Sequence, residues 1–517
     1  MAESRPQRRG GGRAARVAAR QAAPVQNPAA PGQRGGRYAP LSEAELLNIY
    51  RTALRLLSEL GLGESPPVLV EAALGRGAQL SPEGRLCFPR GLVEDVIAGA
   101  CTRFTLHGRE PRHSIELGGD RVYFGTGGAA VQTLDLETGR YRPSTLRDLL
   151  DFTRLADNLP NISWFTRCCI ATDVPDPFDL DINTAYALIR GTTKPVGTSF
   201  STGAAVAPVV DMFDIAMGGT GRFRRQPCLK AHISPIVSPL RFGVDAVDVT
   251  LACVAQGVPI NAIIAAQAGA TAPATLAGFL AQSLAETLAG LVMINIFAPG
   301  HPAIFSNWPF VIDLRTGAFA GSGGESAVMN AASAQISNWL GLPSGVAAAM
   351  ADAKAVDAQM GAEKALAAVT AGLAGANMVY ESAGMMASLL GASFEAFVLD
   401  DEMLSHVHRT IRGVEVDEET LGYDAIAAAV RGDGHFLGSD QTLAAMERDY
   451  FYPSLADRDP PVTWAEKGAP DIRARARDTA RAILAAPASN HLGETADAAI
   501  RARWDIHMPQ QAVVVDP

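Results

Sequence analysis

The chain has 517 residues, of which 48% are hydrophobic, and it carries a formal net charge of −10. A chain of this length can bury a large core and exceeds the usual size of one simple domain, so we expect one large domain with extensions, or two domains. The first 38 residues hold eight Arg and one acidic residue, Glu3, and contribute +7, which leaves about −17 for the remainder. An acidic folded part argues against nucleic-acid binding.

Residues 1–38 are rich in Arg, Ala, Gly and Pro and hold almost no large apolar side chains. Such a segment cannot offset its ordering entropy by burial, and we expect a disordered tail. A tether to a partner or to RNA, and a targeting segment, are alternative interpretations of its charge. From Leu41 apolar residues recur at helical spacing, with Ser42 as a candidate N-cap, so residues 39–118 are predicted as a helical lead-in.

Short apolar strands then alternate with longer helical runs, and this pattern predicts a (β/α)₈ TIM barrel over residues 119–413. An open doubly wound sheet is the alternative, but no strand is followed by the glycine-rich turn that opens its first helix. Residues 414–517 are expected to form a C-terminal helical extension. The eight predicted strands lie within residues 122–128, 162–173, 195–203, 228–235, 258–269, 302–309, 343–354 and 376–384.

The six cysteines form no CxxC pair and no His/Cys cluster at zinc spacing, which favours reduced thiols in a cytoplasmic protein and predicts no metal site. The longest apolar stretch, residues 276–299, contains Gln282, Glu286 and Asn295. A bilayer helix would resist the glutamate, so we interpret the stretch as a buried helix and expect no membrane association.

In a TIM barrel the chemistry lies where each strand ends and its loop begins. Aromatic residues gather near several predicted strand ends, and their faces attract cations, above all quaternary ammonium groups. Packing in the barrel is the alternative role of each ring. Asp352 and Lys354 interrupt the run of small and apolar residues from Gly341 to Gln359, and a lysine at a barrel-strand end is costly to bury without a partner. Asp352 and Glu381 are the expected partners of Lys354.

Five further stretches give the chain a resemblance to a known family: RTGAFAGSGGE (315–325), LGLPSGVAAAMADAKAVDAQMGAEKA (340–365), AGLAGANMVYESAG (371–384), FVLDDEMLSHVHRTIRGVEVDEETL (397–421) and GHFLGSDQT (434–442). Together they resemble the trimethylamine methyltransferase superfamily over residues 41–501. The resemblance implies a TIM barrel that takes a methyl group from a methylated amine and passes it to the cobalt of a corrinoid (cobalamin). A separate small corrinoid protein would carry that cofactor, and this chain would bind none tightly. We also expect a homo-oligomer.

The resemblance implies that Lys354 stands at the position that pyrrolysine occupies in the archaeal trimethylamine enzymes. The chain would then belong to the branch without pyrrolysine, whose members are similar to enzymes for quaternary amines such as glycine betaine, proline betaine or carnitine. A quaternary amine leaves as a neutral tertiary amine, so its demethylation asks mainly for positioning.

From these arguments Lys354, Asp352 and Glu381 are the candidate catalytic residues. The candidate substrate-binding residues are the aromatic and polar groups at or near strand ends: His232, Gln267, Phe305, Asn307, Trp308, Arg315, Asn377 and Tyr380. Two alternatives remain open. One is a TIM-barrel enzyme of other chemistry with Lys354 as an imine-forming nucleophile, and the other is a noncatalytic betaine-binding relative.

Overall fold

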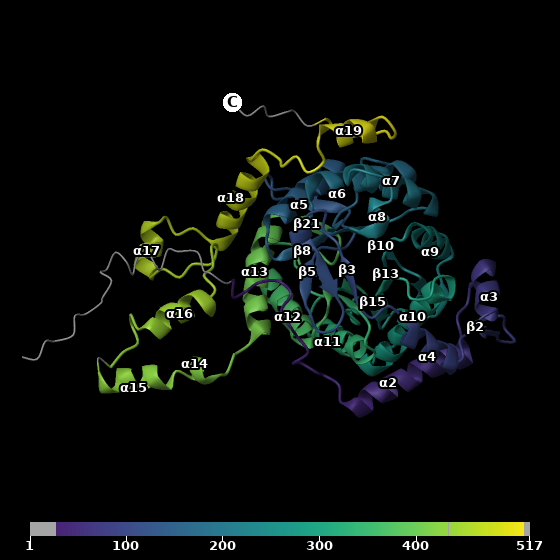
Figure 1. The fold of residues 1–517 in the computed structure, drawn as a ribbon, viewed down its shortest axis with the longest axis horizontal. Helices are drawn as coiled ribbons and strands as arrows, with labels where there is room; N and C mark the ends of the chain where they lie inside the picture. The colour runs from purple at the N-terminus through teal and green to yellow at the C-terminus, as the bar shows by residue number, and fades with distance from the viewer. Residues whose placement is uncertain (1–26, 433, 511–517) are drawn as a thin grey trace, which may run out of the picture.

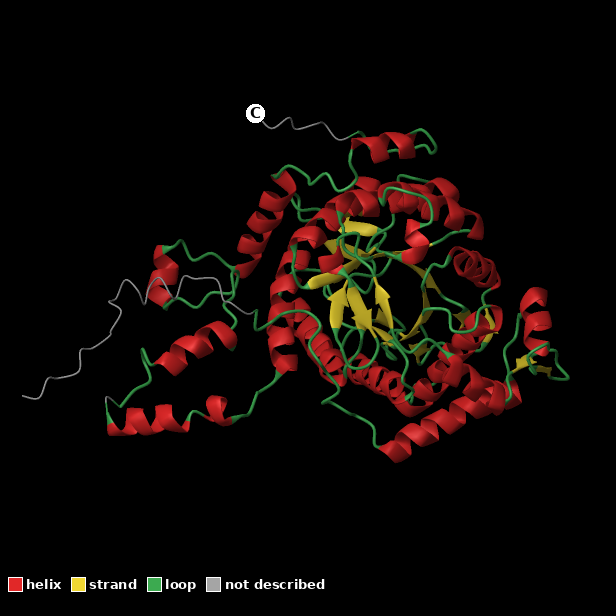
Figure 2. Ribbon diagram, viewed as in Figure 1, coloured by secondary structure: helices red, strands yellow, loops and turns green. Residues whose placement is uncertain are grey.

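A computed structural model describes residues 27–432 and 434–510, and its centre is a closed barrel of eight parallel strands (Figures 1 and 2). Each strand pairs in parallel with its neighbours, and β19 closes the barrel against β5. The predicted (β/α)₈ fold is therefore confirmed. In barrel order the strands are β5 (Tyr123–Gly125), β8 (Ile162–Thr166), β9 (Val196–Ser199), β10 (Leu229–Ile233), β13 (Ile260–Ile264), β15 (Ala303–Asn307), β18 (Ser344–Ala347) and β19 (Met378–Tyr380).

Helices surround the barrel and run back from its mouth, the end at which the strands finish (Figure 2). Polar residues cap several of them at that end: Thr145 and Asp148 form a capping box before α5, Asp176 caps α6, and Asp357 caps α12. The surrounding helices are α5 (Leu146–Asn158), α6 (Pro177–Gly191), α7 (Val206–Ala216), α8 (Arg222–Arg225), α9 (Val244–Gln256), α10 (Leu276–Phe297), α11 (Gly324–Trp339), α12 (Ala358–Ala374) and α13 (Phe394–Arg412).

Helix α10 is apolar on all sides because it lies in the protein interior. Among the described residues it is the one helix long and apolar enough to cross a membrane, and 83% of its most apolar window is buried inside the protein. Glu286, within it, accepts hydrogen bonds from Ser238 Oγ at 2.6 Å and from the Leu240 amide at 3.0 Å. The helix therefore has the surroundings expected for a buried core helix.

Glycines on the inner face of the barrel make room for its largest interior side chains. A Cβ on Gly125 would lie 2.3 Å from the Trp164 ring, and one on Gly197 would lie 2.7 Å from Lys230 Nζ. Carbon atoms cannot approach so closely, so any larger residue would force the ring or the amine aside. The strand sequences thus reserve the upper interior for Trp164 and Lys230.

Small sheets built from the loops surround the barrel mouth. One joins the loops after β5 and β19, namely β6 (Gln132–Leu134), β7 (Tyr141–Pro143), β20 (Met385–Met386) and β21 (Gly391–Ser393). A second joins the loops after β13 and β15, namely β14 (Gln267–Ala268), β16 (Phe310–Ile312) and β17 (Phe319–Ala320). A hairpin of β11 (Ile236–Val237) and β12 (Arg241–Phe242) follows β10. These pairings fix loops that would otherwise be free to move.

The N-terminal region combines helices and hairpins. Residues 27–38 belong to the segment predicted as a disordered tail, but the Gly32, Gly35 and Arg37 amides donate to the carbonyls of Val122, Asp120 and Leu373. The tail boundary is corrected for these residues, and residues 1–26 lie outside the described part. The lead-in holds α2 (Glu43–Arg55), a π-helical turn η1 (Leu56–Leu60), α3 (Pro67–Leu74) and α4 (Arg90–Gly99), together with a 3₁₀ turn η2 (Pro111–His113) and the hairpins β1 (Gln79–Leu80) with β2 (Leu86–Cys87) and β3 (Phe104–Leu106) with β4 (Ile115–Leu117).

The C-terminal extension divides into two parts. Residues 414–466, which we call the arm, extend away from the barrel (Figure 1) and hold α14 (Glu418–Leu421), α15 (Tyr423–Arg431), α16 (Asp440–Arg448) and α17 (Pro461–Glu466). Helix α18 (Ile472–Ala485) returns to pack on α13 and α5, and α19 (Glu494–Arg501) packs on α7. The described residues of the arm helices include none that is buried.

Candidate functional site

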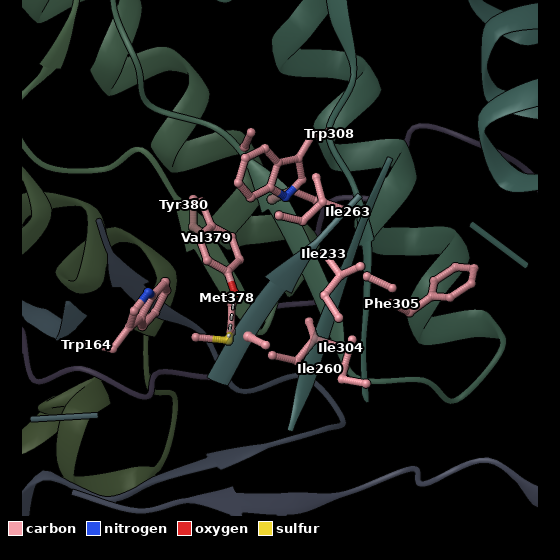
Figure 3. Packing of buried hydrophobic residues seen from close by; sticks show 14 of the residues in the cluster. Trp164, Ile233, Ile260, Ile263, Ile304, Phe305, Trp308, Met378, Val379 and Tyr380 are labelled. Atoms are coloured by element: carbon pink, nitrogen blue, oxygen red, sulfur yellow. Dashed lines mark hydrogen bonds between the residues drawn. The ribbon is translucent and has the colours of Figure 1, made fainter. Parts of the chain in front are cut away.

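Three aromatic rings meet inside the mouth of the barrel and form the centre of the candidate site, which we call the aromatic cluster. Trp308 follows β15, Tyr380 ends β19, and His232 lies near the end of β10. The ring centroid of Tyr380 lies 5.1 Å from that of Trp308 and 5.2 Å from that of His232, and the His232 and Trp308 centroids are 5.9 Å apart. Figure 3 shows Trp308 above Tyr380, with Trp164 on the other side. Such a group of ring faces suits a cationic ligand.

A chain of polar side chains holds His232 from below. Lys230 Nζ donates to Thr166 Oγ1 at 2.7 Å and lies 2.9 Å from His232 Nε2, while Asn261 Nδ2 lies 3.3 Å from the same ring nitrogen. Ser306 Oγ donates to Asn261 Oδ1, which fixes the amide so that its nitrogen faces His232. Nε2 therefore accepts, and His232 is neutral with its proton on Nδ1.

Burial disfavours the charged forms of Lys230 and His232. It lowers the pKa of both groups well below their usual values, and the nearby Lys230 amine lowers the pKa of His232 further. No carboxylate in the described residues forms an ion pair with Lys230, whose Nζ lies 4.8 Å from the centre of the Tyr380 ring.

Glu381 brings a buried carboxyl group without a partner to the same end of the barrel. Its side chain is fully buried, and neither carboxyl oxygen has a hydrogen-bond partner among the described residues. Burial raises its pKa to about 8, an effect that the charge of Lys364 only partly offsets. Lys364 is already paired with Asp400 at 3.0 Å. Glu381 is therefore mostly protonated at neutral pH, and a cation placed beside it would favour the ionised form.

Backbone strain and two glycines position this carboxyl group. Glu381 has a φ of +64°, a left-handed conformation that is unusual for a residue other than glycine. A Cβ on Gly127 would lie 3.0 Å from one carboxyl oxygen, and one on Gly128 would lie 2.9 Å from the other. The loop after β5 thus leaves space for the carboxyl group, which accounts for the two glycines in its sequence FGTGG (124–128).

Three predicted binding residues lie in or beside barrel strands but outside the cluster. The Phe305 ring points away from Trp308 and Tyr380 (Figure 3). Asn307 donates to Ser283 Oγ at 2.9 Å and Ser333 Oγ at 3.0 Å, so it joins α10 to α11 outside the barrel. Asn377 precedes β19 at the opposite end of the barrel, where it donates to the carbonyls of Gly119 and Arg121. The alternation of strand side chains separates Phe305 and Asn307 from their inward neighbours.

Two predicted cations lie on the surface. The Arg315 side chain is 88% exposed and pairs with Asp313 at 2.8 Å in its own turn. Lys354 is exposed, and its backbone carbonyl accepts a hydrogen bond from the Tyr141 hydroxyl at 3.0 Å. Among the ion pairs of the described residues, none joins Lys354 to Asp352. The expected position of Lys354 inside the mouth is corrected, because the chain leaves the barrel in an exposed turn after residue 353.

Asp352 and Gln267 belong to the loops of the mouth. Asp352 accepts from the Gly321 amide at 2.9 Å, from Ser322 Oγ at 2.8 Å and from Ser388 Oγ at 2.8 Å. It therefore ties the loops after β15, β18 and β19 together, which is a positioning role. Gln267 begins β14 and is half-buried. Of the predicted site residues, His232, Trp308, Tyr380 and Glu381 are the ones that the fold gathers in the upper barrel.

The sequence reasoning missed Lys230, Asn261 and Arg167. Strand alternation could have found Lys230, because it precedes the predicted His232 by two residues and must share its face.

Two other features lie away from the mouth. A hollow of about 940 Å³ lies between the arm and the far end of α13. The second is a contact near the C-terminus, where the His507 amide donates to Asn183 Oδ1 of α6 at 2.8 Å.

A parallel (β/α)₈ barrel with an aromatic cluster and unpartnered ionisable groups at the carboxyl ends of its strands has the architecture of a TIM-barrel enzyme site. A sequence model of the family described as trimethylamine methyltransferase (MTTB) matches residues 9–506. The chain belongs to this family, and its curated relatives are named as methyltransferases.

Among these relatives, the glycine betaine methyltransferase of Desulfitobacterium hafniense (strain Y51) is 30% identical over 86% of this chain and 92% of its own length. A trimethylamine methyltransferase of D. hafniense (strain DSM 10664 / DCB-2) is also 30% identical, over 86% of this chain and 89% of its own length. The trimethylamine methyltransferase of Methanosarcina thermophila is 29% identical over 88% of this chain and 94% of its own length. The family and the class of reaction thus agree with the resemblance found in the sequence.

Proposed function

We propose that the chain demethylates a quaternary amine and passes the methyl group to the cobalt of a corrinoid held by a separate small protein. The observation that carries this proposal is the aromatic cluster of His232, Trp308 and Tyr380 at the barrel mouth. Ring faces attract a cation by about 0.5 to 2 kcal/mol each when it is desolvated. The family membership supplies the reaction class.

The residues of this chain would bind and aim the substrate. The cluster would hold the positive head, neutral His232 would not oppose it, and Glu381 would add negative charge as it ionises. When the carbon–nitrogen bond breaks, nitrogen keeps the electron pair and leaves as a neutral tertiary amine. No proton has to be supplied, so positioning of the methyl group toward the mouth is the main requirement.

A reduced corrinoid supplies a cobalt atom that can accept a methyl group. The partner protein would hold the corrinoid, and we assign no residue of this chain to it. All six cysteines are free thiols, which supports the proposal of a cytoplasmic protein.

The test is methyl transfer from a panel of amines to free reduced cobalamin, which is measured as loss of the cobalt(I) absorption spectrum. Glycine betaine, proline betaine, carnitine and trimethylamine form the panel. We expect transfer from at least one quaternary amine and less from trimethylamine. Tight binding of a quaternary amine with no transfer, either to cobalamin or to a corrinoid protein, would identify a noncatalytic binding protein instead.

We also propose that the arm packs against a second copy of this chain. Large apolar side chains are strongly exposed along it, among them Val414 (81%), Leu421 (63%), Tyr423 (74%), Val430 (78%) and Leu437 (76%). Its helices have 4 to 9 residues, and isolated helices shorter than about 12 residues are marginal in water. An arm of this kind gains stability by covering its apolar side chains against another subunit.

Light scattering on the Tyr423→Glu/Val430→Glu variant tests this second proposal. We expect a lower mass than for the wild-type protein, because two charges in a subunit interface cannot be desolvated cheaply. Val244→Glu is the matched control, since Val244 is an exposed apolar residue of the barrel layer (60%). A wild-type monomer, or an unchanged mass in the arm variant, would contradict the proposal.

A further inference from the structure

A buried lysine of helix α12, Lys364, reaches the ends of strands β18 and β19 from the helical layer. Its Nζ donates to the Ala349 carbonyl at 2.6 Å, lies 3.5 Å from the Glu381 carbonyl and pairs with Asp400 of α13 at 3.0 Å. The Lys364 side chain has no exposed surface. A buried ammonium group is costly unless its protons have partners, and here three oxygen atoms surround it.

The two carbonyls belong to residues in a strained backbone conformation. Ala349 has a φ of +72° and Glu381 a φ of +64°, although neither residue is glycine. Ala349 comes shortly after the end of β18, and Glu381 directly follows β19. Left-handed residues of this kind persist only where the surrounding structure holds them, and they gather at functional sites. Lys364 thus holds the backbone at two places where the chain leaves the barrel.

Asp400 extends this support to the rest of the turn after β19. Its carboxylate accepts from the Gly384 amide at 2.7 Å. On the side of the barrel strands, the Ser382 amide donates to the Gly125 carbonyl of β5 at 3.0 Å. A buried turn needs such partners because its backbone groups have no access to water. The backbone of residues 381–384 is therefore fixed both by the helical layer and by the barrel.

The Glu381 carboxyl group, in contrast, is left free beside the aromatic cluster. A Cβ on Gly127 would lie 3.0 Å from Glu381 Oε1 and 3.2 Å from Tyr380 Cδ1, so the carboxyl group and the ring border the same point. Neither carboxyl oxygen has a hydrogen-bond partner among residues 27–432 and 434–510. The protein thus fixes the backbone of Glu381 and provides no partner for its side chain.

We propose that Lys364 is a positioning residue of the methyl-transfer site, which holds the left-handed backbone at Glu381 and thereby directs the free carboxyl group toward the ammonium group bound at Tyr380. Lys364 acts through Glu381, because its own contacts are with the two strained carbonyls and with Asp400. The identity of the ligand rests on the proposed function, whereas the positioning rests on contacts within the chain.

The charge of Lys364 acts on the same carboxyl group. Burial raises the pKa of Glu381, and the positive charge of Lys364 lowers this pKa in part. Asp400 faces the turn from α13, and Tyr380 and the Cys168 thiol lie within electrostatic reach of the carboxyl group. None of these three groups brings a positive charge. Removal of the Lys364 ammonium should therefore raise the pKa of Glu381.

Difference infrared spectroscopy of the full-length chain tests the proposal, because a protonated carboxyl group has a carbonyl band that disappears on ionisation. Glu381→Gln identifies the band of this residue. In the wild-type protein the midpoint of its titration should lie near the pKa of about 8. Lys364→Met should move the midpoint upward by about one pH unit or more, the shift that a nearby opposite charge produces. A wild-type midpoint in the folded variant would overturn the proposal.

A double variant separates positioning from stability. Lys364→Met alone leaves Asp400 buried without its counterion and should lower the melting temperature. Lys364→Met/Asp400→Asn removes both charges and keeps an acceptor for the Gly384 amide. It should regain most of the melting temperature while its midpoint stays raised. A double variant that regains the wild-type midpoint together with the stability would show that Lys364 only balances the charge of Asp400.

Lys194→Met is the matched control. Lys194 is also buried and also holds backbone carbonyls, those of Ala156, Leu159 and Ile162, but at the opposite end of the barrel. Its removal should lower the melting temperature and leave the Glu381 midpoint unchanged. An equal shift of the midpoint in Lys194→Met would contradict the proposal, because loss of any buried lysine would then have the same effect.

Calorimetric titration with glycine betaine measures the consequence for binding. Between about pH 6 and pH 9 the wild-type affinity should rise with pH, because only the ionised Glu381 attracts the ammonium group by its charge. At about pH 7 the double variant should bind about three- to tenfold more weakly, since a pKa raised by one unit reduces the ionised fraction tenfold. Equal affinity of the two proteins at this pH would contradict the positioning role.

The infrared titration needs no ligand, so this inference and the proposed function can fail separately. If the wild-type chain binds no quaternary amine and the midpoint still shifts in the Lys364 variants, the positioning role stands and the proposed function fails. If glycine betaine binds and the midpoints of the wild-type protein and the Lys364 variants coincide, the proposed function stands and the positioning role is refuted.

Discussion

The two ends of the barrel treat buried polar groups in opposite ways. At the end where the strands begin, Lys194 donates to the carbonyls of Ala156, Leu159 and Ile162 at 2.6 to 2.8 Å. At the mouth, Arg167 and Glu381 have no partner within the described residues. The comparison teaches that the buried amine at the lower end is completed by the protein itself, whereas the mouth keeps two unpaired ionisable groups that a ligand can complete.

The largest expected effect concerns Glu381. Its ionisation in the buried mouth should make the protein least stable at high pH. A folded-state pKa of about 8, against an ordinary value of 4.5, means that ionisation of the group lowers the free energy of unfolding by about 5 kcal/mol relative to the protonated form. The wild-type protein should therefore lose stability as the pH rises from about 4.5 to 8. Glu381→Gln should lack this loss, and melting temperatures of both proteins across this range provide the measurement.

Matching pH profiles for the two proteins would show that the carboxyl group is not buried without a partner. Asp352→Asn is a useful control because the Asp352 carboxylate has several hydrogen-bond donors. Asp352→Asn should not show the higher melting temperature, relative to wild type at high pH, that we expect for Glu381→Gln.

Lys194 tests the other end of the barrel. Lys194→Met removes the donor shared by three buried carbonyls and should lower the free energy of unfolding by about 3 kcal/mol. Chemical denaturation measures this loss. Ligand affinity of the folded variant should stay unchanged because Lys194 lies far from the mouth. A Lys194→Met variant that keeps its stability but binds ligand more weakly would contradict this assignment, because it would give Lys194 a role in binding instead of in stability.

Trp308 tests whether the aromatic cluster belongs to the binding end. Trp308→Ala should weaken binding of a quaternary amine by about 1 to 2 kcal/mol through loss of one ring face. Calorimetry with the best amine of the panel measures it, and Trp339→Ala, at a partly exposed ring that packs on Tyr50 of α2, is the control. An unchanged dissociation constant in folded Trp308→Ala protein would remove the ring from the site.

The smallest expected effect concerns Lys354. Because this side chain is exposed, Lys354→Met should change stability by less than about 0.5 kcal/mol and leave turnover of every amine unchanged. The measurement is the cobalt(I) assay together with thermal melting. A large loss of turnover would show that the turn after residue 353 closes over the mouth when substrate binds.

The sequence by itself determined the barrel and part of its site. Eight apolar runs separated by helical runs, without the glycine-rich turn of a doubly wound sheet, indicate a closed parallel sheet, and Trp308, Tyr380 and Glu381 follow from where those runs end. The family blocks determined the reaction class, because they match a family of methyltransferases.

Only the tertiary structure decided which polar side chains face the interior and which have partners. In the run that ends at Ala365, the exposed lysine is Lys354, whereas Lys364 is buried against Asp400. The two lysines look alike in sequence. The conformation of one short turn determines which of them is buried. The isolation of Arg167 likewise depends on Asp181 turning to Ser201. Pairing of this kind is set by three-dimensional packing, and the pattern of residues along the chain does not contain it.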